Sequence, residues 1–387
     1  MKTKNITILG STGSIGRSTL DVIIKHPGAF NVVALAAFSN VELIVEQFHK
    51  FQPKYICLVD ESKREELETK LKNSTVNFVY GEDELVNLAK LSENDMVVNA
   101  VVGSAGLLAS LATVNNGIDL GLANKESLVT GGPLFEKILK KTGAKILPID
   151  SEHSAIWQTL AAGKPEEIKR LIITASGGPF RTMPKEEFAS ITPEKALDHP
   201  TWKMGPKISI DSATLANKGL EVIEARWLFD LKPEQIDVII HPQSVIHSLV
   251  QFTDGSLKAQ LSSPNMQLPI QYALHYPNRG KNALSQFSLT DHPELTFRQA
   301  DRKKFRNLAL AIVAMKQGGN MPAILNAANE VAVQSFLNGK WPFYRISELV
   351  EEMMNQQNFI SKPDLETYFE TTQKCFAESE AYIRKHT

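Results

Sequence analysis

Short apolar runs alternate with helix-like segments along the first 150 residues, and this rhythm limits what the chain can fold into. Helices are predicted over residues 14–25 and 41–51. Strands are predicted over residues 5–9, 31–37, 55–59, 76–79, 96–99, 119–122 and 145–148. Repeated strand–helix–strand units form parallel sheets that are covered by helices. The pattern therefore predicts an α/β fold with a doubly wound, Rossmann-like parallel sheet as the N-terminal domain, residues 1–150.

The rhythm changes after residue 150. Strand-like runs at 171–174, 207–210, 238–240 and 256–260 lie among loops rich in Gly, Pro, Ser and His, which predicts a central α+β catalytic domain over 151–275. Residues 276–300 have few periodic apolar positions and predict a linker. Residues 301–387 predict a C-terminal helical domain, with helices at 305–316, 323–336, 346–354 and 365–384. A chain of 387 residues is long enough for two or three domains.

Composition excludes several classes of protein. The formal net charge of −1 argues against a general nucleic-acid surface, which needs an excess of Lys and Arg. Cys57 and Cys375 are far apart and lack a Cys/His cluster, so neither a zinc site nor a disulfide framework is expected. No apolar run approaches the length of a membrane span, and the N-terminus lacks the apolar core of a secretory signal. We expect a cytoplasmic enzyme.

A glycine-rich turn, GSTGSIG, follows the first predicted strand and opens the first predicted helix. Its glycines, Gly10, Gly13 and Gly16, allow a tight turn and close backbone approach to a pyrophosphate at the helix N-terminus. The spacing is GxxGxxG rather than the commoner GxGxxG, and a plain strand-to-helix turn is the alternative. In its βαβ context the turn predicts a dinucleotide site.

The end of the second predicted strand bears on which dinucleotide binds. An NAD site carries Asp or Glu there to bond the ribose 2′-hydroxyl. This chain instead has Phe38, Ser39 and Asn40, and no acid repels a 2′-phosphate. Ser39 and Asn40 can donate hydrogen bonds to that phosphate, which favours NADP(H).

Polar residues also follow other strands of this domain. In a doubly wound sheet, ligands bind at the carboxyl ends of the strands. Lys125 is therefore expected to face the substrate, and Asn124 the cofactor. A solvated polar turn is the alternative.

Three carboxylates form a candidate cation site. Asp150 and Glu152 flank Ser151 after the run 146–149, and extended backbone would place both carboxylates on one face. Glu221 lies in a helix expected to begin near Gly219. Oxygen ligands of this kind hold hard cations such as Mg²⁺ or Mn²⁺. A solvated acidic turn is the commoner origin of an isolated DxE.

Two donor turns suit a phosphate group. Residues 211–219 supply Ser212, Asn217 and Lys218, and a second turn, ASGGP, begins at Ala175. Between them lies the segment HPTWKMGP, which starts at His199. A Trp and a Met beside Gly and Pro in a loop predict a lid that closes over the substrate. An indole buried in the core is the alternative.

These segments belong to a longer series of motifs. GSTGSIG, LANKESLVT, DSEHSAI, SGGPFR, HPTWKMG, DSATLANKGLEVIEA, HPQSVIHS and LNAANE occur in this order. Together they resemble the 1-deoxy-D-xylulose 5-phosphate reductoisomerase family, from residue 6 to about residue 335. Many members carry Gly-Lys before the asparagine where this chain has Phe38-Ser39, a departure that bears on the strength of NADPH preference.

The resemblance implies an activity and a set of site residues. The family converts 1-deoxy-D-xylulose 5-phosphate to 2-C-methyl-D-erythritol 4-phosphate with NADPH and Mg²⁺ or Mn²⁺, in non-mevalonate isoprenoid biosynthesis, as a homodimer. It implies metal ligands at Asp150, Glu152 and Glu221. Substrate contacts are implied at Lys125, Ser151, Glu152, Ser176, His199, Ser212, Asn217, Lys218 and Glu221, and the lid interpretation adds Trp202. NADPH contacts are implied at Thr12, Gly13, Ser14, Ile15, Asn40, Asn124, Glu126 and Gly205, and the place of Ser39 at the end of the second predicted strand adds this residue.

The expected reaction combines a rearrangement with a reduction. The cation would polarise the substrate carbonyl, a carbon–carbon bond would break and re-form, and NADPH would reduce the resulting aldehyde. Asp150, Glu152, Glu221, Lys125 and His199 are the expected catalytic residues. Two other functions remain open. One is a simple NADP-dependent, metal-assisted hydroxy-acid dehydrogenase, and the other is a non-catalytic protein that senses a nucleotide.

Overall fold

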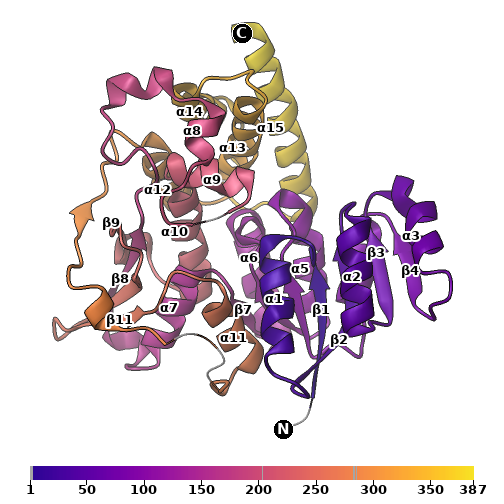
Figure 1. Ribbon diagram of the computed structural model, residues 1–387. Coiled ribbons are helices and arrows are strands. Elements are labelled where there is room, and N and C mark those ends of the chain that lie inside the picture. Colours follow the sequence, from indigo (N-terminus) through magenta and orange to yellow (C-terminus); the bar gives the residue numbers. More distant parts are fainter. Residues whose placement is uncertain (1–2, 203, 282–283, 285) are drawn as a thin grey trace. The chain divides into compact units, whose positions relative to one another are not determined.

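A computed structural model describes residues 3–202, 204–281, 284 and 286–387, and these form two compact units (Figure 1). The first unit comprises Met1–Ser127, Pro133–Ser154 and Asn265–Gln286. The second comprises Leu128–Gly132, Ala155–Pro264 and Phe287–Thr387. Helices α6 (Lys125–Thr142) and α7 (Ser151–Leu160) contain residues of both units.

The first unit is built on a parallel sheet of seven strands in the order β4-β3-β2-β1-β5-β6-β7. Apart from the added edge strand β4, this is the order of a dinucleotide-binding sheet, and it confirms the Rossmann-like prediction. The strands are β1 (Lys4–Leu9), β2 (Phe30–Ala37), β3 (Tyr55–Leu58), β4 (Asn77–Tyr80), β5 (Met96–Asn99), β6 (Asp119–Leu122) and β7 (Ile146–Pro148). All pair in parallel. The chain runs from β1 through β2 and β3 to the edge strand β4, then returns to the other side of β1 and continues through β5, β6 and β7.

Helices connect these strands. They are α1 (Ser14–Ile24), α2 (Val41–Phe51), α3 (Arg64–Lys70), α4 (Asp83–Ala89), α5 (Gly106–Asn115) and α6, and α11 (Gln267–His275) also belongs to this unit. The central strands β2 and β5 are buried over almost their whole length, as expected for a sheet with both faces covered. Lys4 Nζ donates to the carbonyl oxygens of Leu274 and Tyr276, at 3.0 and 2.7 Å, and so ties the end of α11 to β1.

The second unit contains a mixed sheet and most of the C-terminal helices. Its strands lie in the order β11-β10-β8-β9-β12, and only β8 and β9 pair in parallel. They are β8 (Ile168–Ala175), β9 (Ile236–Ile240), β10 (Ile246–Phe252), β11 (Leu257–Leu261) and β12 (Arg298–Gln299). The helices are α8 (Pro193–Leu197), α9 (Pro206–Ala213), α10 (Ala216–Phe229), α12 (Arg306–Gln317), α13 (Met321–Leu337), α14 (Ile346–Gln356) and α15 (Leu365–His386).

Short 3₁₀ turns complete the described elements, at Glu61–Lys63, Gly103–Ala105, Pro165–Glu167, Lys185–Ser190, Pro233–Gln235, Leu289–Asp291 and Phe343–Arg345. One apolar core runs through the second unit, from β8 and β9 through α9 and α10 to α12–α14. It includes Ile173, Ile210, Leu220, Leu308 and Ile324. This core fixes α9 and α10 against the C-terminal helices.

One predicted element is wrong. Residues 207–210 were expected to form a strand because Ile208 and Ile210 alternate with polar residues, but they lie in helix α9. Gly205 is the N-cap and Pro206 occupies the first helical position, which proline favours. Lys207 and Asp211, four residues apart, form an ion pair on one face of this helix. Their spacing was the sequence signal for a helix.

Candidate functional site

The glycine-rich turn lies between β1 and α1. The connections that follow β1 and its neighbour β5 lead toward opposite edges of the sheet. Gly10 has φ +84°, and a Cβ there would stand 2.6 Å from the carbonyl oxygen of Ala100, which follows β5. A Cβ on Gly16 would lie 2.3 Å from the oxygen of Gly10. The N-cap of α1, Gly13, has no side-chain cap, so the first N–H groups of the helix remain available to an anion.

The polar residues of this turn are placed for contact with a ligand. Gly13 and Ser14 are exposed, whereas Thr12 and Ile15 are half-buried. Ser11 is fully buried, and its carbonyl oxygen accepts a hydrogen bond of 2.9 Å from the Gln47 side chain. The Gln47 side chain therefore holds the buried side of the turn, while Gly13 and Ser14 are exposed to solvent.

The tip of β2 carries no acidic residue. Phe38 is 69% exposed, Ser39 is half-buried, and the Asn40 side chain caps α2 by accepting from Leu43 N–H at 3.0 Å. Asp60 bonds to Phe38 through its backbone N–H, but its carboxylate accepts from Ser62 N–H and Oγ–H at 3.1 and 2.6 Å. The described tip therefore offers hydroxyl and amide groups without a carboxylate of its own.

The turn after β6 places a lysine beside an acid. The Asn124 side chain caps α6, accepting from Ser127 N–H at 3.1 Å, and its amide donates to the oxygens of Val101 and Gly103 at 2.8 and 2.7 Å. The Lys125 ammonium, 8% exposed, pairs with the carboxylate of Asp150. Glu126 is buried beside the Asn124 amide, 3.4 Å away.

Asp150 immediately precedes helix α7, and Ser151 begins it. The expectation of extended backbone through Asp150 and Glu152 is therefore wrong, because Glu152 lies in the first turn of a helix. A carboxylate is favoured there by the helix dipole. Ser151 is buried and donates a hydrogen bond from its hydroxyl to Glu152.

In the second unit, the turn after β8 meets the lid segment. Ser176 Oγ lies 3.1 Å from His199 Nε2 and accepts a longer bond of 3.3 Å from Gly178 N–H. Gly177 and Gly178 both have positive φ, at +84° and +67°. A Cβ on Gly178 would stand 2.7 Å from the carbonyl oxygen of Ser212, so the two donor turns pack directly against each other.

The hydrogen bonds of His199 define its tautomer. Its Nδ1 accepts from the N–H groups of Thr201 and Trp202 at 3.1 and 3.0 Å, and therefore carries no proton. In the neutral ring the proton is on Nε2, which donates toward Ser176 Oγ. Burial, followed by the positive charge of Arg181, lowers the pKa of His199. The ring is thus a neutral donor at neutral pH.

Helix α10 carries the remaining donors together with an acid. It begins at Ala216, three residues earlier than expected, so Asn217 and Lys218 lie in its first turn rather than in a loop. Asn217 Nδ2 donates to Glu221 Oε1 at 2.6 Å, and Lys218 pairs with Glu221 Oε2. Lys218 and Glu221 are only 5% and 1% exposed, so each needs the other's charge.

The lid segment is only partly described, because Lys203 lies outside the described residues. The ring of Trp202 meets that of His247 edge-on, with centroids 6.3 Å apart, and Trp202 itself is half-buried. Gly205, at the end of the segment, is exposed and has open space around its Cα. Trp202 is therefore neither a fully buried core residue nor a free surface one.

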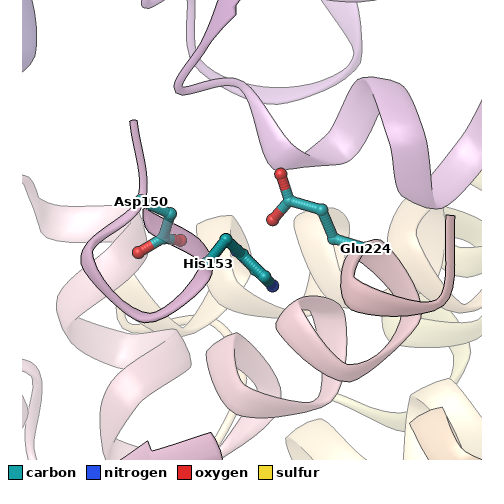
Figure 2. A group of neighbouring side chains, drawn as sticks. All are labelled: Asp150, His153 and Glu224. Atoms are coloured by element: carbon teal, nitrogen blue, oxygen red, sulfur yellow. The ribbon is translucent and has the colours of Figure 1, made fainter. Parts of the chain in front are cut away.

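Two groups of described residues have the composition of a cation site. One is Asp150, Glu152 and Glu221, and the other is Asp150, His153 and Glu224. Asp150, Glu152 and His153 belong to the first unit, and Glu221 and Glu224 belong to the second. Figure 2 shows the second group, with Asp150 immediately before α7, His153 in the first turn of α7 and Glu224 on α10.

The two groups differ in chemistry. The all-carboxylate group offers the hard oxygen ligands that Mg²⁺ and Mn²⁺ prefer, whereas an imidazole nitrogen favours transition metals. The sequence interpretation missed His153 and Glu224. A signal for Glu224 was available, because it lies three residues after Glu221 and such residues share a helix face.

Comparisons with known proteins agree over most of the chain. The family described as 1-deoxy-D-xylulose 5-phosphate reductoisomerase matches residues 6–132. Its C-terminal domain matches residues 146–229, and a further domain described as DXP reductoisomerase C-terminal domain matches residues 261–376. A 1-deoxy-D-xylulose 5-phosphate reductoisomerase of Chloroherpeton thalassium is 50% identical over 351 residues, 91% of each chain. That of Thermoanaerobacter pseudethanolicus is 50% identical over 367 residues, covering 94% of this chain and 95% of its own.

Solved structures give the same result. The reductoisomerase of Zymomonas mobilis in complex with NADPH is 40% identical, with a TM-score of 0.92, and the match covers 98% of this chain and 99% of that one. A DOX-P reductoisomerase in complex with NADPH, fosmidomycin and magnesium is also 40% identical, with a TM-score of 0.93 and 98% of both chains covered.

Proposed function

The chain belongs to the 1-deoxy-D-xylulose 5-phosphate reductoisomerase family, and we propose that the residues described above carry out that family's reaction. The enzyme converts 1-deoxy-D-xylulose 5-phosphate to 2-C-methyl-D-erythritol 4-phosphate with NADPH and a divalent cation, Mg²⁺ or Mn²⁺, in isoprenoid biosynthesis. The observation that carries this conclusion is 50% identity to named reductoisomerases over more than nine-tenths of the chain.

Asp150, Glu152 and Glu221 hold the divalent cation in this proposal. All three supply carboxylate oxygens, which fits a hard cation. When bound, the cation supplies Lewis-acid polarisation of the substrate's oxygens. Lys125 and Lys218 pair with Asp150 and Glu221, each within its own unit, and so orient these two carboxylates.

The substrate phosphate is proposed to bind to donors of the second unit. His199 offers its Nε2–H, Ser176 and Ser212 offer hydroxyls, and Asn217 and Lys218 offer an amide and an ammonium. Because Asn217 and Lys218 also bond to Glu221, they link this anion site to one cation ligand. Contacts of Lys125, Ser151, Glu152, Glu221 and Trp202 with the rest of the substrate complete the proposal. Holding the phosphate far from the reacting carbons orients them for rearrangement.

NADPH is proposed to bind along the carboxyl ends of the parallel strands. Its pyrophosphate faces the turn Gly10–Gly16 and the uncapped start of α1. Its 2′-phosphate faces Ser39 and Asn40 at the tip of β2, where the described residues include no carboxylate. The further contacts proposed are Thr12, Gly13, Ser14, Ile15, Asn124, Glu126 and Gly205. Since the Asn124 side chain is used in capping α6, this residue is proposed to contact the cofactor through its backbone.

The direct test is to incubate the purified chain with 1-deoxy-D-xylulose 5-phosphate, NADPH and Mg²⁺ and to identify the product by NMR. We expect the branched 2-C-methyl-D-erythritol 4-phosphate and metal-dependent oxidation of NADPH. A product reduced without rearrangement would instead indicate a hydroxy-acid dehydrogenase. NADPH binding without oxidation would indicate a protein that senses a nucleotide.

Homodimeric assembly and a cytoplasmic location are further parts of the proposal. Both cysteines are free and buried, and burial raises the pKa of the Cys57 and Cys375 thiols to about 12, as suits structural thiols in a reducing compartment. No helix among the described residues is long and apolar enough to cross a membrane. Light scattering after size-exclusion chromatography should give twice the chain mass, and a monomer mass at micromolar concentration would remove the dimer from the proposal.

A further inference from the structure

Two buried residues and one half-buried lysine, all outside the proposed catalytic set, form a connected network in the second unit. Lys207 Nζ lies 2.8 Å from Asp211 Oδ2, both on α9, and Asn329 Nδ2 on α13 donates to Asp211 Oδ1 at 2.7 Å. We name these three residues the α9 clamp. Asp211 and Asn329 are each 1% exposed, and the Lys207 side chain is 17% exposed. The clamp joins segments 118 residues apart in the sequence.

The clamp has a defined geometry. Each carboxylate oxygen of Asp211 has one partner. A buried carboxylate without such partners would strongly destabilise the fold. The Asn329 amide oxygen is buried and lacks a hydrogen-bond partner among the described residues. Rotating this amide by half a turn would bring that oxygen against the carboxylate. The orientation of Asn329 is therefore set by Asp211, even though an acceptor is left unsatisfied.

Helix α9 connects two parts of the proposed substrate site. It begins directly after Gly205, where the lid segment ends, and it contains Ser212, one of the proposed phosphate donors. The carbonyl oxygen of Ser212 faces Gly178 so closely that no side chain fits between them. A small displacement of α9 would therefore move both Ser212 and the turn that carries Ser176.

We propose that Asn329, Asp211 and Lys207 are positioning residues for the substrate phosphate. Through the clamp, α13 fixes the end of α9 that carries Ser212, and Lys207 fixes its beginning, where the lid segment joins the helix. This inference rests on the proposed function of Ser212 and the lid, and none of the three residues touches the substrate in it. Ser212 and Ser176 would bind the phosphate equally in the ground and transition states, so weakening their contacts should raise KM with little change in kcat.

The test begins with turnover of 1-deoxy-D-xylulose 5-phosphate by the wild-type enzyme. This measurement distinguishes a failure of the proposed function from a failure of the inference about the clamp. If the wild type does not produce the branched product, the proposed function fails. If it does, Asn329→Leu should raise the KM for the sugar phosphate roughly tenfold or more, while kcat and the KM for NADPH change less than about threefold. A purely structural role would lower the amount of active enzyme and leave both KM values unchanged.

Asn326→Leu is the matched control. Asn326 lies one turn earlier on α13, is also 1% exposed, and also has a buried amide oxygen without a hydrogen-bond partner among the described residues. It is not part of the clamp, so its replacement should leave the KM for the sugar phosphate unchanged. If the two variants raise this KM equally, the effect comes from α13 as a whole and the inference is wrong.

Lys207→Met keeps the inference testable if Asn329→Leu does not fold. The change retains the apolar stem of a partly exposed side chain and removes the ammonium that pairs with Asp211. It should raise the KM for the sugar phosphate in the same direction as Asn329→Leu, again without altering the KM for NADPH. An unchanged KM in Lys207→Met, with wild-type kcat, would overturn the proposal.

Discussion

The glycine-rich turn of the first unit and the α9–α10 region of the second are both proposed anion sites, but they are built differently. Between β1 and α1 the donors are backbone N–H groups, and the key residues, Gly10 and Gly16, act by lacking a side chain. In α9 and α10 the donors are side chains such as Lys218, held in place by other buried side chains.

This difference has an energetic consequence. A site made of backbone N–H groups depends on a backbone conformation and a close approach that only glycine allows. One added methyl group can therefore block it. A site of buried ions depends on pairs, because a charge that loses its partner in the interior becomes strongly unfavourable. The turn should therefore be sensitive to volume, and the α9–α10 region to charge and hydrogen-bond pairing.

The largest effect is expected at the cation ligands. Asp150→Asn, Glu152→Gln and Glu221→Gln should each lower kcat by on the order of 10²–10³, because the cation's stabilisation of charge in the transition state is lost. NADPH affinity, measured by fluorescence titration, should not change. Glu66→Gln, at an exposed carboxylate paired with Lys63, is the control and should be fully active. Full activity of a ligand variant in Mg²⁺ would remove that residue from the site.

The turn provides the next largest effect and tests the backbone side of the comparison. Gly16→Ala would place a methyl group 2.3 Å from the Gly10 oxygen, and we expect NADPH affinity to fall about 10–100-fold, with a loss of about 1–3 kcal/mol in the free energy of unfolding. Gly13→Ala is the control, because its Cβ would lie 3.4 Å from that oxygen. Equal NADPH affinity in the two variants would contradict a backbone-built site.

A third effect concerns the lid. Trp202→Ala should weaken the binding of a phosphonate that bears a hydroxamate by about 1–3 kcal/mol through loss of an aromatic contact. Calorimetry in the presence of Mg²⁺ measures the affinity. The wild type should also show a change of tryptophan fluorescence on binding that Trp202→Ala lacks. Unchanged affinity together with unchanged fluorescence would make Trp202 a structural residue.

A smaller effect is expected at the tip of β2. NADPH should be preferred over NADH, and Ser39→Asp should lower that preference about tenfold, because a carboxylate repels the 2′-phosphate and accepts from a ribose 2′-hydroxyl. The measurement is the ratio of kcat/KM for the two cofactors. Equal ratios in wild type and variant would place the 2′-phosphate elsewhere.

The smallest effect concerns pH. Because the folded protein lowers the pKa of His199 below its usual value of about 6.5, the neutral ring stabilises the fold fully above that value. This contribution is lost as the pH falls through the folded-state pKa, when a proton on Nδ1 displaces the Thr201 and Trp202 N–H donors. NMR titration of His199 should give a midpoint below 6.5, with smaller hydrogen-exchange protection factors for these two amides at lower pH. A midpoint above 6.5 would contradict the assigned tautomer.

The local pattern of apolar and polar residues was sufficient to predict helices and strands wherever neighbouring residues decide the structure. Helix α2 was predicted with its observed bounds, and the βαβ rhythm gave the parallel sheet, because strand and helix periods are local properties of the chain. Local pattern failed in α9, where alternating isoleucines suggested a strand. There the Gly205–Pro206 start and contacts with a distant helix outweigh the alternation.

The sequence alone determined the fold class of the first unit, the place of the glycine-rich turn between its first strand and helix, and, through its motifs, the family. Only the tertiary structure decided which side chains meet. The bond between Ser176 and His199 and the bond from Asn329 to Asp211 join residues that lie 23 and 118 positions apart in the chain. No local period encodes such pairs, because their free energy depends on burial and on partners that only the folded chain brings together.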